Sequence, residues 1–195
     1  HACLPLRPFP EGLNEAAALA ALSPDKDVDC ATDAMLLATL TGRPDALAPC
    51  TAEAVIAILD YYGIEITGAR VAVVGRSNVI GRPVAALLTA RDATVTVCHS
   101  RTVDVSAITR EAEVLVVAAG QAHMIGANHV SSGQTVIDVG INWDEKSQRL
   151  VGDVDTEAIK DIVAAYTPVP GGVGSVTTAI LAKHVIEAAE RTLVS

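Results

Sequence analysis

Aromatic side chains are scarce in this chain. One Trp, one Phe and three Tyr make up 3% of its 195 residues, although half of the residues are hydrophobic. The core must therefore come from aliphatic side chains, and Ala, Val, Leu and Ile supply most of them. Such a composition suits Val- and Ile-rich strands covered by Ala- and Leu-rich helices, as in α/β proteins. A chain of this length can form one domain or two small ones.

Basic residues and long apolar runs are also lacking. The chain has 14 Lys and Arg against 23 Asp and Glu, which gives a net charge of −9. Binding to nucleic acid without regard to sequence needs many cations at phosphates, so the charge argues against a nucleic-acid partner. No apolar run reaches the length that spans a bilayer, so we also expect no membrane partner.

The cysteines form no recognisable framework. Cys3, Cys30, Cys50 and Cys98 are widely spaced and include no C-x-x-C pair. This spacing favours reduced thiols and a cytoplasmic location. The first ten residues are typical of neither a signal peptide nor a transit peptide. They begin with His rather than Met, as expected of a fragment or a processed chain.

The pattern of apolar residues indicates alternating strands and helices from Val71 onward, which predicts a doubly wound parallel sheet. We expect strands near 71–74, 94–98, 114–118 and 135–139, and helices near 81–91, 103–111 and 127–131. Ahead of this region we expect helices near 13–22, 33–40 and 52–62, with Thr51 as the N-cap of the third. We also expect a charged loop at 25–29, a polar turn region at 142–153 and a closing helix from Ser175.

A glycine loop follows the first expected strand, in the run Val71-Ala-Val-Val-Gly-Arg-Ser-Asn-Val-Ile-Gly-Arg-Pro83. Gly75 lets the chain turn sharply off the strand, and Gly81 allows two backbones to approach closely. Pro83 suits the first turn of a helix whose free amides attract phosphate. The six-residue spacing of the glycines differs from G-x-G-x-x-G, and an ordinary strand-to-helix turn would contain the same glycines.

The end of the second expected strand favours NADP over NAD. NAD sites usually place Asp or Glu there to hold the ribose 2′-hydroxyl, whereas this chain has His99-Ser-Arg-Thr102. A carboxylate would repel a 2′-phosphate. Ser100 can donate a hydrogen bond to it, and Arg76 or Arg101 can form charge-assisted bonds. Each arginine alone could equally be a solvated surface residue, but together with the loop they indicate an NADP site.

Several histidines have less specific interpretations. His123 and His129 are six residues apart with no Cys or carboxylate cluster nearby, so we interpret them as surface or capping residues and predict no metal site. His99 could take part in acid–base chemistry, but its place at a strand end favours a structural or cofactor-contacting role.

Three aspartates and one cysteine also stand out in the sequence. Asp153 and Asp155 could form a catalytic carboxylate pair, although a solvated turn is the preferred interpretation. Asp138 lies within an apolar strand, so its carboxylate needs a partner, which we expect in the loop after Gly140. Cys98 is expected in the core.

The chain resembles the bifunctional methylenetetrahydrofolate dehydrogenase/methenyltetrahydrofolate cyclohydrolase family over nearly its whole length. Eight segments carry the resemblance in order: Leu4-Pro-Leu6, Lys26-Asp-Val-Asp29, Pro49-Cys-Thr51, Gly75-Arg-Ser77 through Gly81-Arg-Pro83, Cys98-His-Ser-Arg-Thr102, Val136-Ile-Asp-Val-Gly-Ile-Asn142, Val151-Gly-Asp-Val154 and Thr167-Pro-Val-Pro-Gly-Gly-Val-Gly174.

The resemblance implies NADP-dependent oxidation of 5,10-methylenetetrahydrofolate to the 5,10-methenyl form, followed by hydrolysis to 10-formyltetrahydrofolate. It also implies a homodimer paired through the nucleotide domain. With the residue arguments above, the expected cofactor-binding set is Gly75, Arg76, Ser77, Gly81, Pro83, Ser100, Arg101, Ile141 and Thr178, with Thr177 as an alternative to Thr178. The resemblance implies that Asp29 holds the pterin and that the loop with Pro170, Gly171 and Gly174 lines the folate cleft.

We expect a Rossmann-like parallel-sheet domain at 59–174 that binds NADP. A partial α/β domain at 1–58, completed by a helix at 175–195, would bind the folate side.

The chain also departs from the family pattern. Cys3 stands where the family has Gln, and Cys30-Ala-Thr32 stands where it has Gly-Phe-His or similar. The Tyr and Lys of the family's catalytic helix have no counterpart in this sequence, so no catalytic residue is assigned. Two alternatives therefore stay open: a catalytically impaired NADP-binding paralogue or fragment, and a dehydrogenase acting on another substrate.

Overall fold

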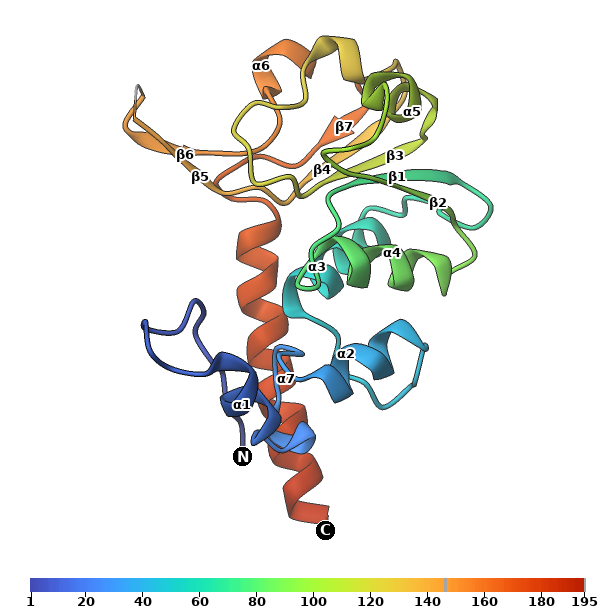
Figure 1. The fold of residues 1–195 in the computed structure, drawn as a ribbon. Helices are drawn as coiled ribbons and strands as arrows, with labels where there is room; N and C mark the ends of the chain where they lie inside the picture. The colour runs from blue at the N-terminus through green and yellow to red at the C-terminus, as the bar shows by residue number, and fades with distance from the viewer. Residues whose placement is uncertain (146, 195) are drawn as a thin grey trace.

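A five-stranded parallel sheet lies at the centre of the computed structural model, which describes residues 1–145 and 147–194 (Figure 1). The strand order is β2-β1-β3-β4-β7. The chain thus adds β2 on one side of β1 and then adds β3 and the later strands on the other side, so the strand order reverses between β1 and β3. The predicted doubly wound sheet is confirmed. Its strands are β1 (Arg70–Val74), β2 (Thr94–Cys98), β3 (Val114–Val117), β4 (Thr135–Asp138) and β7 (Ala165–Tyr166).

Helices cover both faces of the sheet, because successive side chains of a strand point to opposite sides. Val71 and Val73 pack into one core, whereas Ala72 and Val74 pack into the other. The first core is completed by α3 (Cys50–Tyr61), α4 (Gly81–Thr89) and the start of α7 (Val173–Val194). The second face is covered by α5 (Val105–Glu111), the 3-10 helix η2 (Ala127–His129) and α6 (Thr156–Ile159) (Figure 1).

The N-terminal elements lie beside α7, which extends away from the sheet (Figure 1). They are α1 (Glu15–Ala20), the 3-10 helix η1 (Pro24–Lys26) and α2 (Asp33–Leu40). Cys30, Met35 and Leu47 form a small separate core there. Because α3 packs both on α7 and in the core under the sheet, it connects the two regions. The domain division at residue 58 stays a prediction.

Several sequence predictions about local structure were wrong. Residues 142–153 contain a hairpin of β5 (Asn142–Asp144) and β6 (Arg149–Val151) rather than only turns. The helix expected near 127–131 is only η2, and β7 and α6 were missed. Each of these elements is four residues or shorter, too short for periodicity to show.

Helix starts also differ from the predictions. Helix α3 begins at Cys50 after Pro49 and has no side-chain cap, so Thr51 is not its N-cap. Helix α7 begins at Val173 rather than Ser175.

The charged loop at 25–29 contains a buried carboxylate. Asp27 accepts hydrogen bonds from the backbone N–H groups of Ala31 and Thr32.

Candidate nucleotide and substrate site

The expected glycine loop brings backbone segments into close approach at the sheet's carboxyl edge. Gly75 follows β1 with φ +130°, and a Cβ there would overlap the backbone carbonyl of Ala118 at the end of β3. A Cβ at Gly81 would overlap the carbonyl of Gly75 itself. The two glycines therefore let α4 start directly against the β1 end, at the point where the strand order reverses. In doubly wound sheets this point is where ligands bind.

The start of α4 differs from the expected set of free amides. The Ser77 hydroxyl oxygen accepts from the N–H of Ile80 at 3.1 Å and of Gly81 at 3.4 Å. The Ser77 carbonyl accepts from the N–H of Arg82 at 3.0 Å. Pro83, which is buried in this first turn, has no N–H to offer. Ser77 thus organises the loop, and its hydroxyl hydrogen is left to donate to a ligand.

The two strand ends that precede the basic residues lie next to each other. Gly75 donates its N–H to the carbonyl of Cys98, which joins the loop after β1 to the end of β2. Arg76, Ser100 and Arg101 are all exposed. Within residues 1–145 and 147–194, neither Arg76 nor Arg101 forms an ion pair with its guanidinium. In a chain with a net charge of −9, two free cations at one corner suit an anionic ligand.

His99 shapes this corner from within the chain. Its Nδ1 accepts from the N–H of Arg101 at 3.2 Å, and Thr102 donates its N–H to the His99 carbonyl at 2.8 Å. The resulting tight turn presents Ser100 and Arg101 to solvent. Cys98, before the turn, is fully buried as expected, and burial raises the pKa of its thiol.

The preferred interpretation of Asp153 as a solvated turn residue was wrong, because its side chain is fully buried. Its carboxylate accepts from the N–H groups of Ala119 at 2.6 Å, Gly120 at 2.8 Å and Gln121 at 2.9 Å. It also accepts from the amide of Asn142 at 2.9 Å. Asp153 thus holds the loops after β3 and β4 together, a role that sequence spacing did not reveal.

Asp138 has backbone partners as its burial requires, but they are Gly140 itself, Asp153 and Val154 rather than the loop directly after Gly140. Its Oδ1 accepts from the N–H of Gly140 at 2.9 Å, and its Oδ2 from that of Val154 at 3.0 Å. Burial raises the pKa of this carboxyl even though it accepts three backbone hydrogen bonds. A Cβ at Gly140 would overlap the Asp153 carboxylate, and one at Gly152 would overlap that of Asp138. The two carboxylates therefore fix the backbone at Gly140, directly before Ile141, against the segment that contains Gly152.

A cavity of about 230 Å³ joins that backbone to the glycine-rich loop before α7. The structure brings five predicted residues together in its lining, namely Ile141, Pro170, Gly171, Gly174 and Thr178. The side chain of Ile141 is 62% exposed, so it can contact a ligand. Thr177 does not line this cavity, and its hydroxyl donates to the carbonyl of Val173.

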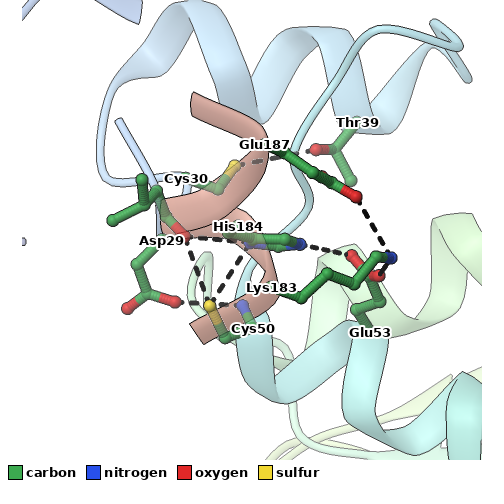
Figure 2. A network of polar contacts seen from close by, with 9 residues as sticks. Asp29, Cys30, Thr39, Cys50, Glu53, Lys183, His184 and Glu187 are labelled. Atoms are coloured by element: carbon green, nitrogen blue, oxygen red, sulfur yellow. Dashed lines mark hydrogen bonds and ion pairs between the residues drawn. The ribbon is translucent and has the colours of Figure 1, made fainter. Parts of the chain in front are cut away.

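Asp29 lies apart from that cavity, at the start of α3 (Figure 2). Its Oδ1 accepts from the N–H of Cys50 at 2.9 Å, and the residue is half-buried. A polar network that the sequence analysis missed surrounds this point: His184 of α7 contacts both Glu53 of α3 and the Val28 carbonyl (Figure 2).

The corner at Gly75 fits a phosphorylated dinucleotide. A Cβ at either loop glycine would fill the approach. Arg76 and Arg101, which form no ion pair within the described residues, follow the two strand ends there, together with the exposed Ser77 and Ser100. Among the described residues there is no group of three His, Cys, Asp or Glu side chains placed to hold a metal ion. In that same part of the chain, no helix is long and apolar enough to cross a membrane.

Comparison with known proteins connects this geometry to one family. Residues 49–193 match the model of the tetrahydrofolate dehydrogenase/cyclohydrolase NAD(P)-binding domain. The bifunctional protein FolD of Clostridioides difficile is 48% identical over 93% of this chain and 63% of its own length. FolD 2 of Frankia alni is 50% identical over 93% of this chain and 62% of its own length. The chain thus spans somewhat less than two thirds of these relatives.

Solved structures agree in fold. The dehydrogenase–cyclohydrolase of Trypanosoma brucei, described as complexed with NADP and an inhibitor, superposes with a TM-score of 0.92 at 39% identity, covering 100% of this chain and 68% of that one. The bifunctional enzyme of Campylobacter jejuni also gives a TM-score of 0.92, at 36% identity over 95% of this chain and 66% of its own. The chain therefore belongs to the tetrahydrofolate dehydrogenase/cyclohydrolase family and contains its NAD(P)-binding domain.

Proposed function

We propose that this chain binds NADP and serves the oxidation of 5,10-methylenetetrahydrofolate to 5,10-methenyltetrahydrofolate. The observation that carries the proposal is that Arg76 and Arg101, beside the glycine approach in an otherwise acidic chain, form no ion pair with any residue that the structure describes. A guanidinium can make paired, charge-assisted hydrogen bonds to a phosphate, which suits recognition of the 2′-phosphate.

The chain's residues would divide the binding between them. Arg76, Ser100 and Arg101 would hold the 2′-phosphate, and Ser77 would donate its hydroxyl hydrogen nearby. Gly75, Gly81 and Pro83 would shape the approach for the dinucleotide. Ile141 and Thr178 would lie at its nicotinamide end. This assignment is supported by the order of the strands β2, β1 and β4 along the sheet, whose ends carry most of these residues, and by the cavity that Ile141 and Thr178 share.

The substrate residues would act on the other side of the cavity. The loop with Pro170, Gly171 and Gly174 would line the folate cleft, and Asp29 would hold the pterin. Gly174 and His184 are ten residues apart on α7, or about 15 Å along a helix. His184 contacts Val28, the neighbour of Asp29 in the chain. A ligand that reaches both the glycine-rich loop and Asp29 would therefore have to be elongated.

When bound, NADP supplies the hydride acceptor for the methylene carbon. The chain's share is to orient the two ligands and to exclude water between them. Hydrolysis to 10-formyltetrahydrofolate would follow in a protein that carries the family's Tyr and Lys. The product would serve one-carbon metabolism, including purine biosynthesis.

We also propose a homodimer in the cytoplasm. The edge strand β2 has an unpaired side and exposes Val97, which supports pairing through the nucleotide domain. Four free thiols, three of them buried, support a reducing compartment.

Cofactor choice tests the proposal. We expect Arg76→Ala and Arg101→Ala each to weaken NADP binding by about 1.5–3 kcal/mol, measured by calorimetry, and to leave NAD binding nearly unchanged. Arg82→Ala, in the first turn of α4 directly after the loop, is a matched control, because its guanidinium already hydrogen-bonds Asn78. Equal losses for NADP and NAD would show that the 2′-phosphate is not bound at this corner.

Turnover separates the remaining alternatives. Formation of NADPH with methylenetetrahydrofolate supports the dehydrogenase. NADP binding without turnover would favour the impaired paralogue or fragment, for which Cys3 and Cys30 at the folate-side positions are the supporting observation. NADP-dependent turnover that folates do not inhibit would instead indicate another substrate.

A further inference from the structure

His184 is a fully buried, ionisable side chain in the middle of α7 that the proposed reaction does not use. Its Nε2 lies 2.8 Å from the Glu53 carboxylate oxygen Oε2, and its Nδ1 lies 2.9 Å from the Val28 carbonyl oxygen (Figure 2). The imidazole thus spans from α3 to the segment that precedes Asp29.

The partners of the ring determine how many protons it carries. A carbonyl oxygen and an ionised carboxylate only accept hydrogen bonds, so each ring nitrogen must donate one. Only the imidazolium form has two N–H groups. Burial alone would lower the pKa of His184, but the hydrogen bonds to Glu53 and Val28 outweigh it and raise that pKa above 6.5. The carboxyl of Glu53 responds in the opposite direction: burial is outweighed by hydrogen bonds from His184 and Lys183, which lower its pKa to about 2.

The groups around the ring support a positive charge. Glu53 and Cys50 face it from α3, and the Cys50 Sγ lies 3.5 Å from Nδ1. On α7, Glu187 adds a further negative charge and Lys183 a positive one, and Lys183 also pairs with Glu53 at 2.8 Å.

The same contacts fix the backbone that carries Asp29. The Val28 carbonyl accepts from His184 and also from the Cys50 thiol at 3.3 Å. The next residue, Asp29, accepts from the N–H of Cys50. The Val28–Asp29 segment is therefore held between α7 and the first turn of α3, and His184 supplies the α7 side of that link.

We propose that His184, as a buried imidazolium, is a positioning residue for Asp29: it holds the Val28 carbonyl and Glu53 so that the Asp29 carboxylate stays against the start of α3, facing the folate. The role of Asp29 toward folate rests on the function proposed above, whereas the charge and the positioning effect of His184 do not.

Nitrogen-15 NMR on the unmodified protein tests the charge directly. At neutral pH we expect both ring nitrogens of His184 to carry a proton. A neutral His184 tautomer at neutral pH would overturn the proposal. This measurement needs no variant and no ligand.

A pair of neighbouring variants tests the positioning. For His184→Gln, we expect the Cys50 amide proton to shift and to exchange about tenfold faster, because its acceptor Asp29 is displaced. Affinity for 5-formyltetrahydrofolate should fall about tenfold, while NADP affinity stays within about twofold. Lys183→Gln also loses a Glu53 contact but does not reach Val28, so it should change neither signal.

The outcomes separate the two proposals. An unchanged Cys50 amide and unchanged folate affinity in His184→Gln would contradict the role of His184, as would equal effects of Lys183→Gln. If the unmodified protein binds NADP but not the folate, the substrate half of the proposed function fails. The ring nitrogens and the Cys50 amide would still decide the role of His184. If His184→Gln failed to fold, the nitrogen-15 spectrum of the unmodified protein would still decide the charge on which that role depends.

Discussion

At the scale of single residues, backbone atoms occupy the space where Gly75 and Gly81 would place a side chain. We expect Gly75→Ala to lower the free energy of unfolding by about 3 kcal/mol or more, since it combines a positive φ with a backbone overlap. Urea unfolding measures this loss. Gly68→Ala is the matched control, because Gly68 has φ +74° but nothing within 4 Å of its Cβ position. It should cost only about 1 kcal/mol, and equal losses would contradict the close approach.

Cys30 is a second residue with an unusual backbone, since its φ is +53°. This conformation explains why glycine suits the position in the family pattern. A β-branched side chain tolerates it poorly, so we expect Cys30→Val to be destabilising. Cys98→Val adds the same volume to another buried site, but in an extended strand. The first variant should therefore be less stable than the second by about 1–2 kcal/mol in thermal or urea unfolding. A smaller loss at Cys30 would contradict the interpretation.

At the scale of elements, Asp153 connects the ends of β3 and β4. Asp153→Asn would turn an N–H₂ group toward N–H donors, so we expect a loss of about 2–4 kcal/mol in urea unfolding. The control is Asp155→Asn, two residues away, where the side chain caps α6 and Asn caps equally well. It should stay within about 0.5 kcal/mol of the unmodified protein. Similar losses in both variants would show that Asp153 has no special role in joining the strand ends.

Elements with a strong local pattern were predictable from the sequence. The buried strands β1, β3 and β4 are short apolar runs bounded by polar residues, and α2 was predicted with its observed bounds. The hairpin β5–β6 and the strand β7 were not predictable, because most of their residues are exposed and show no apolar pattern. These strands are defined by the segments to which they hydrogen-bond. Tertiary context decided those elements.

The candidate site divides in the same way. The loop after β1 and the turn after β2 could be found because each lies within one short run of sequence. The contact between His184 and Glu53 spans 131 residues, and that between Asp153 and Ala119 spans 34, so no local pattern indicates either. Asp153 also resembles a surface turn in its sequence neighbourhood, and only the fold reveals the three N–H groups around it.

At the scale of the whole molecule, the Glu53–His184 pair connects α7 to α3, and its contribution to stability depends on pH. The Glu53 carboxyl has its pKa lowered to about 2, so its contribution is complete above 4.5 and is lost as pH falls toward 2. The pKa of His184 is raised, so its contribution is complete below 6.5 and is lost as pH rises through the higher folded value.

We therefore expect Glu53→Gln to cost most between about pH 4.5 and 6.5, roughly 2 kcal/mol, and less on either side. Urea unfolding across this range, compared with the unmodified protein, measures the difference. Glu187→Gln is the control, because Glu187 adds a negative charge near His184 and pairs with the exposed Lys183 at 3.7 Å, but within residues 1–145 and 147–194 it forms no hydrogen bond to the ring, so its cost should be smaller. A cost for Glu53→Gln that does not change with pH would contradict the charged pair.

Calorimetric titration of the unmodified protein with NADP and with NAD, at matched ionic strength, tests the central claim most directly. Residues 75–80 and 99–102, which directly follow β1 and β2, carry two guanidiniums, those of Arg76 and Arg101, and no carboxylate. We therefore expect NADP to bind at least about tenfold more tightly than NAD, and added salt to weaken the binding of NADP more than that of NAD. Equal affinities, or no heat with NADP, would contradict a 2′-phosphate site at Arg76 and Arg101 and the NADP-dependent function proposed from it.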